Sequence, residues 1–202
     1  MIRRMPPLRP TAATLRHAWR AFAVGTAGVA AIEFALILPV MITMYLGVTE
    51  FSFGYATNRK LTLLSRTVAD LTARATTISG DDISGIFAAA SSVLQPYDSA
   101  QASMVLTSVT VKMVNSKPVG TVDWSCAKLG PGSPYAKRGK GSTYPVPSGF
   151  ENSSSFVLSE TAYKYVPVLG SSFAPAGGYT LQQSTPWPVR NSAQVTWSGS
   201  AC

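Results

Sequence analysis

A long apolar stretch at residues 21–48 limits most strongly what this chain can fold into. It reads AFAVGTAGVAAIEFALILPVMITMYLGV and contains one charged residue, Glu33. About 20 apolar residues are enough for a helix to cross a bilayer. The run is longer than the apolar core of a usual secretory signal, and no small-x-small cleavage site precedes a polar start at its far end. We therefore predict a retained transmembrane helix.

The charge distribution gives this helix a direction. The chain has a formal net charge of +8, of which five positive charges lie in residues 1–28 with no acidic residue beside them. Cytoplasmic flanks of membrane helices carry an excess of Lys and Arg. We therefore expect a cytoplasmic N-terminus and export of everything after about residue 50. The remaining chain carries a net charge of +3 and no long basic stripe, which argues against nucleic acid as a partner. The five charges belong to Arg3, Arg4, Arg9, Arg16 and Arg20.

The helical pattern continues beyond the membrane. Apolar residues recur with a spacing of three and four, which is typical of one helix face. Arg66, Asp70 and Arg74 follow one another at four-residue intervals on another face, where opposite charges stabilise a helix modestly. We expect this helix to end near residue 76. The apolar positions are Leu61, Leu64, Val68, Leu71 and Ala75.

After this helix the pattern predicts one short helix and then strands. Ser79 can cap a helix that ends before Pro96. Residues 104–114 are rich in β-branched side chains, a turn follows, and residues 119–126 suit the partner strand of a hairpin. Residues 129–149 form a loop rich in Gly and Pro. The fold class is therefore α+β, with a mainly antiparallel sheet. Further strands are expected at residues 156–168, 179–183 and 193–197.

The exported part offers two cysteines and no catalytic set. His17 is the only histidine, and no Cys/His pattern suited to a metal is present. We expect no enzyme activity, no cofactor, no metal and no small-molecule substrate. The basic residues Lys137, Arg138 and Lys140 read as a solvated loop, or as a contact to an anionic polymer or a partner subunit. Cys126 and Cys202 can form a disulfide in an oxidising compartment, but unrelated thiols or links to neighbouring subunits remain open.

Glu33 marks the candidate functional segment. A carboxylate inside a membrane helix costs about 2.5–3.5 kcal/mol at the centre of the bilayer, so it suggests a function. Snorkelling of Glu33 toward the headgroups is the structural alternative. The glutamate follows Gly28 at the fifth position, and Phe34 comes next. This arrangement resembles the processing site of type IV prepilins.

A longer run carries a more specific resemblance. Residues 28–39 read GVAAIEFALILP, and the match continues through Gly47, Glu50, Phe51 and Gly54 towards Asn58. This segment is similar to the TadE-like pseudopilins of tight-adherence (Flp) pili over roughly residues 25–75. The resemblance implies cleavage by a prepilin peptidase between Gly28 and Val29, with Glu33 and Phe34 acting in assembly. It also implies that Glu33 pairs with the free amine of a subunit's N-terminus.

The resulting prediction divides the chain into four parts. They are a cytoplasmic leader (1–28), a transmembrane helix (29–48), an amphipathic helical stalk (49–96) and an exported β-rich domain (97–202). Because major Flp pilins are short, the exported domain favours an accessory subunit that contacts the bacterial inner membrane, the peptidase and other pilus subunits. The rival is an uncleaved, signal-anchored envelope protein whose exported domain is adhesive or binds a ligand.

Overall fold

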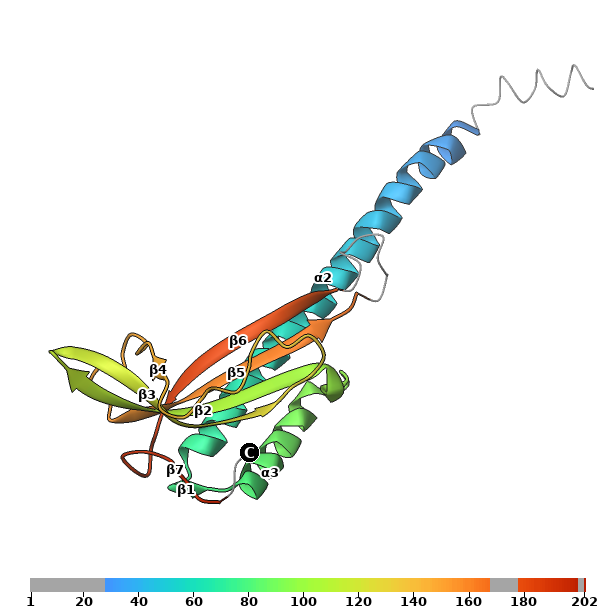
Figure 1. The fold of residues 1–202 in the computed structure, drawn as a ribbon. Coiled ribbons are helices and arrows are strands. Elements are labelled where there is room, and N and C mark those ends of the chain that lie inside the picture. Colours follow the sequence, from blue (N-terminus) through green and yellow to red (C-terminus); the bar gives the residue numbers. More distant parts are fainter. Residues whose placement is uncertain (1–27, 168–177, 200–201) are drawn as a thin grey trace, which may run out of the picture. The chain divides into compact units, whose positions relative to one another are not determined.

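The computed structural model describes residues 28–167, 178–199 and 202 (Figure 1). The predicted leader, with His17 and the five arginines, lies outside these residues except for Gly28. The chain divides into two compact units, residues 1–49 and residues 50–202. The second unit contains the sheet and every buried apolar residue of the described chain.

The first element is the helix α2, which runs from Val29 to Ala73 and continues through Pro39. Proline leaves the helix without one backbone N–H donor, and the hydroxyl of Thr43 donates to the carbonyl of Pro39 at 2.7 Å. The helix becomes buried only from Gly54 onward, where it joins the core of the second unit.

The predicted apolar stripe on α2 is partly wrong. Leu61, Leu64 and Val68 are buried, but Leu71 remains 38% exposed. The small polar residues Thr57, Ser65 and Thr72 are completely buried instead. Helix residues three and four apart share a face, and small hydroxyl side chains there let the helix approach the sheet closely. Thr57 and Thr72 satisfy their hydroxyl groups by donating to carbonyls one turn earlier.

A second helix, α3 (Gly80–Ser91), begins at the predicted cap. Ser79 and Asp82 form a capping box, in which each side chain accepts a hydrogen bond from the other residue's backbone N–H. These hydrogen bonds from Ser79 lower the pKa of Asp82. Two short 3-10 helices, η2 (Ser92–Leu94) and η3 (Ser99–Gln101), lead from α3 to the sheet.

Within the described residues, five antiparallel strands form the main sheet in the order β4-β3-β2-β5-β6 (Figure 1). The hairpin of β2 and β3 turns at Asn115 and Ser116, which both have positive φ, as a tight hairpin turn requires. This confirms the predicted α+β fold, although β6 is longer than expected. The strands are β2 (Ala102–Val114), β3 (Lys117–Lys128), β4 (Thr143–Tyr144), β5 (Ser155–Tyr165) and β6 (Tyr179–Pro188).

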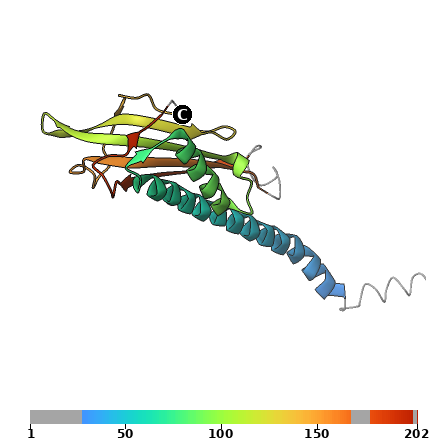
Figure 2. The ribbon, with the colours of Figure 1, turned by 90° about the horizontal axis from the view of Figure 1, so that it is seen from below.

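A bulge in β3 places Val122 and Trp124 on opposite faces of the sheet. Ser108 pairs with Trp124 and Val109 with Val122, so Asp123 is the extra residue. Trp124 therefore packs in the core with α2 and α3, whereas Val122 joins a smaller core with Val109, Phe156 and Leu158. Figure 2 shows α3 and the C-terminal part of α2 beside the sheet.

The predicted loop at residues 129–149 covers the smaller core. Tyr144, Val146 and Phe150 pack against it, and the rings of Phe150 and Phe156 lie 5.2 Å apart. The short strand β4 pairs with β3 at Gly120 and Thr121. This segment is therefore a layer of the fold, although it has little regular secondary structure.

The last strand, β7 (Thr196–Trp197), pairs in parallel with β1 (Thr77–Ile78) outside the main sheet. The sequence predicted a strand at residues 193–197 but not this partner. The pairing attaches the end of the chain to the connection between α2 and α3.

Candidate processing segment and helix–sheet junction

The predicted processing residues lie at the beginning of the described chain. Gly28 directly precedes α2, and Val29 is the first residue of the helix. A Cβ atom added at Gly28 would meet no other atom within 4 Å. Glu33 and Phe34 follow in the first turns of α2 and are exposed. The structure thus places all four residues on one accessible stretch of the chain.

The surface of α2 after Gly28 is apolar and exposed. Phe34, Leu36 and Met44 are 60%, 71% and 66% exposed, respectively. This is the one helix of the described residues that is long and apolar enough to cross a membrane. Exposed apolar surface of this extent is unfavourable in water and suits contact with lipid or with other apolar helices.

Three residues singled out by the family resemblance dock α2 on the sheet. The hydroxyl of Tyr165 donates to Oε1 of Glu50 at 2.7 Å, and Nε2 of Gln183 donates to Oδ1 of Asn58 at 3.2 Å. Between them, a Cβ atom at Gly54 would lie 2.7 Å from the hydroxyl oxygen of Tyr179. Glu50, Gly54 and Asn58 are four residues apart, so they lie along one helix face that meets β5 and β6.

This helix–sheet junction also shifts tyrosine ionisation. Burial, followed by the hydrogen bond to Glu50 and its negative charge, raises the pKa of Tyr165 well above its ordinary value. Burial and the charge of Glu50 also raise the pKa of Tyr179. The two rings lie 5.2 Å apart. Both tyrosines therefore stay protonated at neutral pH, and Tyr165 remains a hydrogen-bond donor.

Two members of the predicted charge series, Asp70 near the end of α2 and Arg74 just after it, form a surface cluster with Arg190. A terminal nitrogen of Arg74 lies 2.5 Å from Oδ2 of Asp70, and one of Arg190 lies 3.1 Å from Oδ1. Desolvation raises the pKa of Asp70, but the Arg74 hydrogen bond and both guanidinium charges outweigh it, so the pKa is lowered. Arg190, which follows β6, was not part of the predicted series.

The prediction of a solvated basic loop is wrong for Arg138. Its guanidinium forms two hydrogen bonds with the carboxylate of Glu160, one of them 2.8 Å long. Glu160 is only 4% exposed, and the guanidinium also lies 5.0 Å from the centre of the Tyr144 ring. The ion pair fastens the covering segment to β5. Lys137 and Lys140 are exposed.

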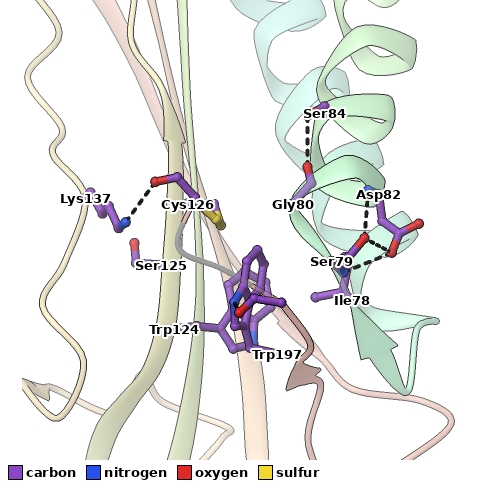
Figure 3. The surroundings of a disulfide bond; sticks show 12 residues. Ile78, Ser79, Gly80, Asp82, Ser84, Trp124, Ser125, Cys126, Lys137 and Trp197 are labelled. Carbon is purple, nitrogen blue, oxygen red and sulfur yellow. Dashed lines mark hydrogen bonds between the residues drawn. A yellow bond between two sulfur atoms is a disulfide. The ribbon is translucent and has the colours of Figure 1, made fainter.

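A disulfide joins Cys126 of β3 to Cys202, with their Cα atoms 5.4 Å apart. Figure 3 shows its surroundings, where Trp124 and Trp197 lie together beside Cys126. Nε1 of Trp124 donates to the carbonyl of Val195 at 2.8 Å, and the two indole rings are 5.5 Å apart. The end of the chain is thus held by a covalent bond, an aromatic contact and the pairing of β7 with β1.

Sequence reasoning missed the partners of these residues. Tyr165 and Tyr179 lie more than 100 residues along the sequence from their partners Glu50 and Gly54. Glu160 is separated from Arg138 by a whole loop. Glu160, an acidic residue in the middle of the predicted strand that became β5, was an available signal of a buried ion pair.

Residues 28–70 match the model of the TadE-like protein family. The resemblance inferred from the sequence is therefore confirmed over this segment, which begins at Gly28. No curated protein and no solved structure matches the chain.

The TadE-like segment, residues 28–70, thus contains two different surfaces of one helix. Its first part carries the exposed apolar side chains, and its second part carries Glu50, Gly54 and Asn58 at the junction with the sheet. In the described residues, no group of three or more His, Cys, Asp or Glu side chains lies close enough to hold a metal ion.

Proposed function

We propose that this chain is a pseudopilin-like accessory subunit of a tight-adherence pilus, with a structural role in pilus assembly. A prepilin peptidase cuts it after Gly28 on the cytoplasmic side of the bacterial inner membrane. The apolar part of α2 anchors the mature chain, and residues 50–202 lie in the periplasm or in the pilus. Its partners are the membrane, the peptidase and other pilus subunits.

The observation that carries this proposal is the family match at residues 28–70, which begins at the glycine of the expected processing site. Two features of the structure support it. Gly28 directly precedes an exposed apolar helix, and the space around its α-carbon is open. A glutamate five residues later suits pairing with a new N-terminal amine, because a partner charge offsets the desolvation of a buried carboxylate.

The length of the mature chain tests the processing step. We expect the intact mass of membrane-bound protein to correspond to a chain that begins at Val29. Gly28→Leu should leave the full-length chain in the membrane, because the bulky side chain blocks the peptidase. The open surroundings of Gly28 mean that this substitution does not disturb the fold.

Gly25→Leu is the matched control, because Gly25 has no glutamate five residues later. This variant should be processed normally. A wild-type chain that still begins at Met1 in a piliated strain would exclude the processing step. The chain would then be interpreted as an uncleaved, signal-anchored envelope protein.

A second experiment separates insertion from assembly at Glu33. Glu33→Gln should insert at least as well as the wild type, because it removes a charge from the membrane. It should assemble poorly, since the amide cannot form an ion pair with an amine. Glu33→Asp keeps the charge and serves as the control. Normal piliation by the Gln variant would show that the carboxylate is incidental.

A further inference from the structure

Three aromatic residues follow the predicted membrane span directly. Phe51, Phe53 and Tyr55 of α2 are 75%, 46% and 65% exposed. Successive helix residues are about 100° apart, so Phe51 and Tyr55 share one face of the helix, and Phe53 lies on nearly the opposite face. Aromatic side chains at the ends of membrane spans favour the headgroup layer, where an apolar ring and a polar neighbour are both accommodated.

The sheet ends at the same level of the helix. Tyr165 and Tyr179 are paired at one end of β5 and β6, and the Tyr165 hydroxyl contacts Glu50. Glu50 is two residues beyond Val48, the predicted end of the span, and two residues reach at most about 7 Å. The headgroup region adds about 5–8 Å on each side of the hydrocarbon core. Glu50 therefore lies no farther from the hydrocarbon boundary than the headgroups extend, and the hydroxyl of Tyr165 at this end of the sheet is hydrogen-bonded to it.

The side chains at this end of the sheet suit that position. Val166 is 60% exposed and Tyr179 40% exposed. A hollow of about 430 Å³ opens beside Val166, lined mainly by aromatic and apolar side chains that include Phe53 and Tyr97. Lys164 lies at the same hollow, and Arg59 is exposed one turn beyond Tyr55. Their positive charges complement anionic headgroups.

We propose that Phe51, Phe53, Tyr55, Val166 and Tyr179 form a membrane-proximal rim that binds the lipid headgroup layer. The second unit then rests on the bilayer instead of standing away from it on a spacer. This inference depends on the membrane anchoring in the proposed function, but not on processing or on the pilus. Its occupant is a lipid surface, because the rim continues the apolar span along one chain.

Depth-dependent fluorescence quenching tests the rim. The full chain is reconstituted in phosphatidylcholine–phosphatidylglycerol vesicles with and without lipids brominated near the top of the acyl chain. Phe53→Trp and Val166→Trp report on the rim, and the parent protein gives the background of the native tryptophans. Tyr45→Trp reports on insertion of the span.

Met113→Trp is the matched exposed control, since Met113 is 62% exposed on the β2–β3 hairpin. Because Ala102 pairs with Tyr163, Met113 lies about 35 Å along the strand from the rim. Quenching is counted as the excess over the parent protein. We expect this excess to be several-fold greater for Phe53→Trp and Val166→Trp than for Met113→Trp. Both rim positions report correctly in either orientation of the protein in the vesicle.

Each contrary result has a separate meaning. If Tyr45→Trp is quenched by brominated lipid but the two rim variants match Met113→Trp, the rim proposal is overturned and the anchoring stands. If the rim variants are quenched neither by brominated lipid nor by aqueous acrylamide, protein covers the rim, and the lipid proposal fails. If Tyr45→Trp itself is not quenched, the anchoring in the proposed function fails, and the rim proposal fails with it.

Discussion

The hydroxyl of Tyr165 donates a 2.7 Å hydrogen bond to Glu50 across 115 residues of sequence. Tyr165 is only 4% exposed. The bond joins the helix that carries the TadE-like segment to the end of the sheet at the beginning of the second unit. A hydrogen bond to a charged acceptor away from bulk water contributes more to stability than one between neutral groups.

Tyr165→Phe should therefore lower the free energy of unfolding of the second unit by about 1–3 kcal/mol, because the ring is kept while the donor to Glu50 is lost. Urea denaturation of the full chain in detergent, followed by circular dichroism, measures this change. Tyr55→Phe is the matched control, since Tyr55 is 65% exposed, and should leave the unfolding midpoint unchanged. Equal effects of the two variants would contradict a structural role for the bond.

The same bond predicts a loss of stability at alkaline pH. The folded chain raises the pKa of Tyr165 through burial and the contact with Glu50, so folding favours the protonated phenol. The corresponding stability is fully present below the ordinary tyrosine pKa of about 10 and is lost as pH rises above it. Melting temperatures of the wild type should fall between about pH 10 and 12. The melting temperature of Tyr165→Phe should fall less steeply with pH. An identical slope for the two proteins would show that Tyr165 does not contribute to the alkaline loss of stability.

Gly54 is expected to tolerate no large side chain. A Cβ atom there would lie 2.7 Å from the Tyr179 hydroxyl, whose ring already packs against Tyr165. Gly54→Leu should destabilise the second unit by about 1–3 kcal/mol through overpacking. Gly85→Leu, at an exposed helix position with open space, should be neutral or gain up to about 1 kcal/mol. Unfolding midpoints that shift equally would contradict the close approach at Gly54.

The buried ion pair predicts different effects for breaking it and for replacing it. Arg138→Met leaves the Glu160 carboxylate buried and unpaired, and should cost about 3–5 kcal/mol. The double variant Arg138→Met, Glu160→Leu removes both charges and should recover much of this loss. Lys140→Met, at an exposed position of the same segment, is the control. The urea midpoints of unfolding rank the three variants against the wild type. A double variant that is no more stable than Arg138→Met would contradict the pairing.

The Cys126–Cys202 disulfide should stabilise the second unit. Closing a loop over 76 residues contributes about 4 kcal/mol in the chain-entropy model. Cys202→Ala should lose this contribution; Cys126 is less suitable for substitution because it is 1% exposed in the core. Non-reducing electrophoresis and thiol alkylation of exported protein check the bond itself. Two alkylatable thiols before reduction would exclude it, and a reducible dimer would indicate a bond between subunits.

Local patterns in the sequence determined much of the secondary structure. The apolar run, the Ser79 cap and the β-branched run at residues 104–114 each report on nearby backbone hydrogen bonds, so they predicted α2, α3 and β2 within a few residues. Residues 28–39 determined the family resemblance in the same way, because that motif is continuous in the sequence.

Only the tertiary structure decided which side chains meet. No local pattern places Tyr165 against Glu50 or Arg138 against Glu160, because these contacts depend on how distant segments meet in the fold. The same dependence explains Leu71 and Ser65. Helical spacing predicts a face but not its centre, and the close approach of α2 to β5 and β6 selected the small hydroxyl residue for burial and left the leucine at the edge.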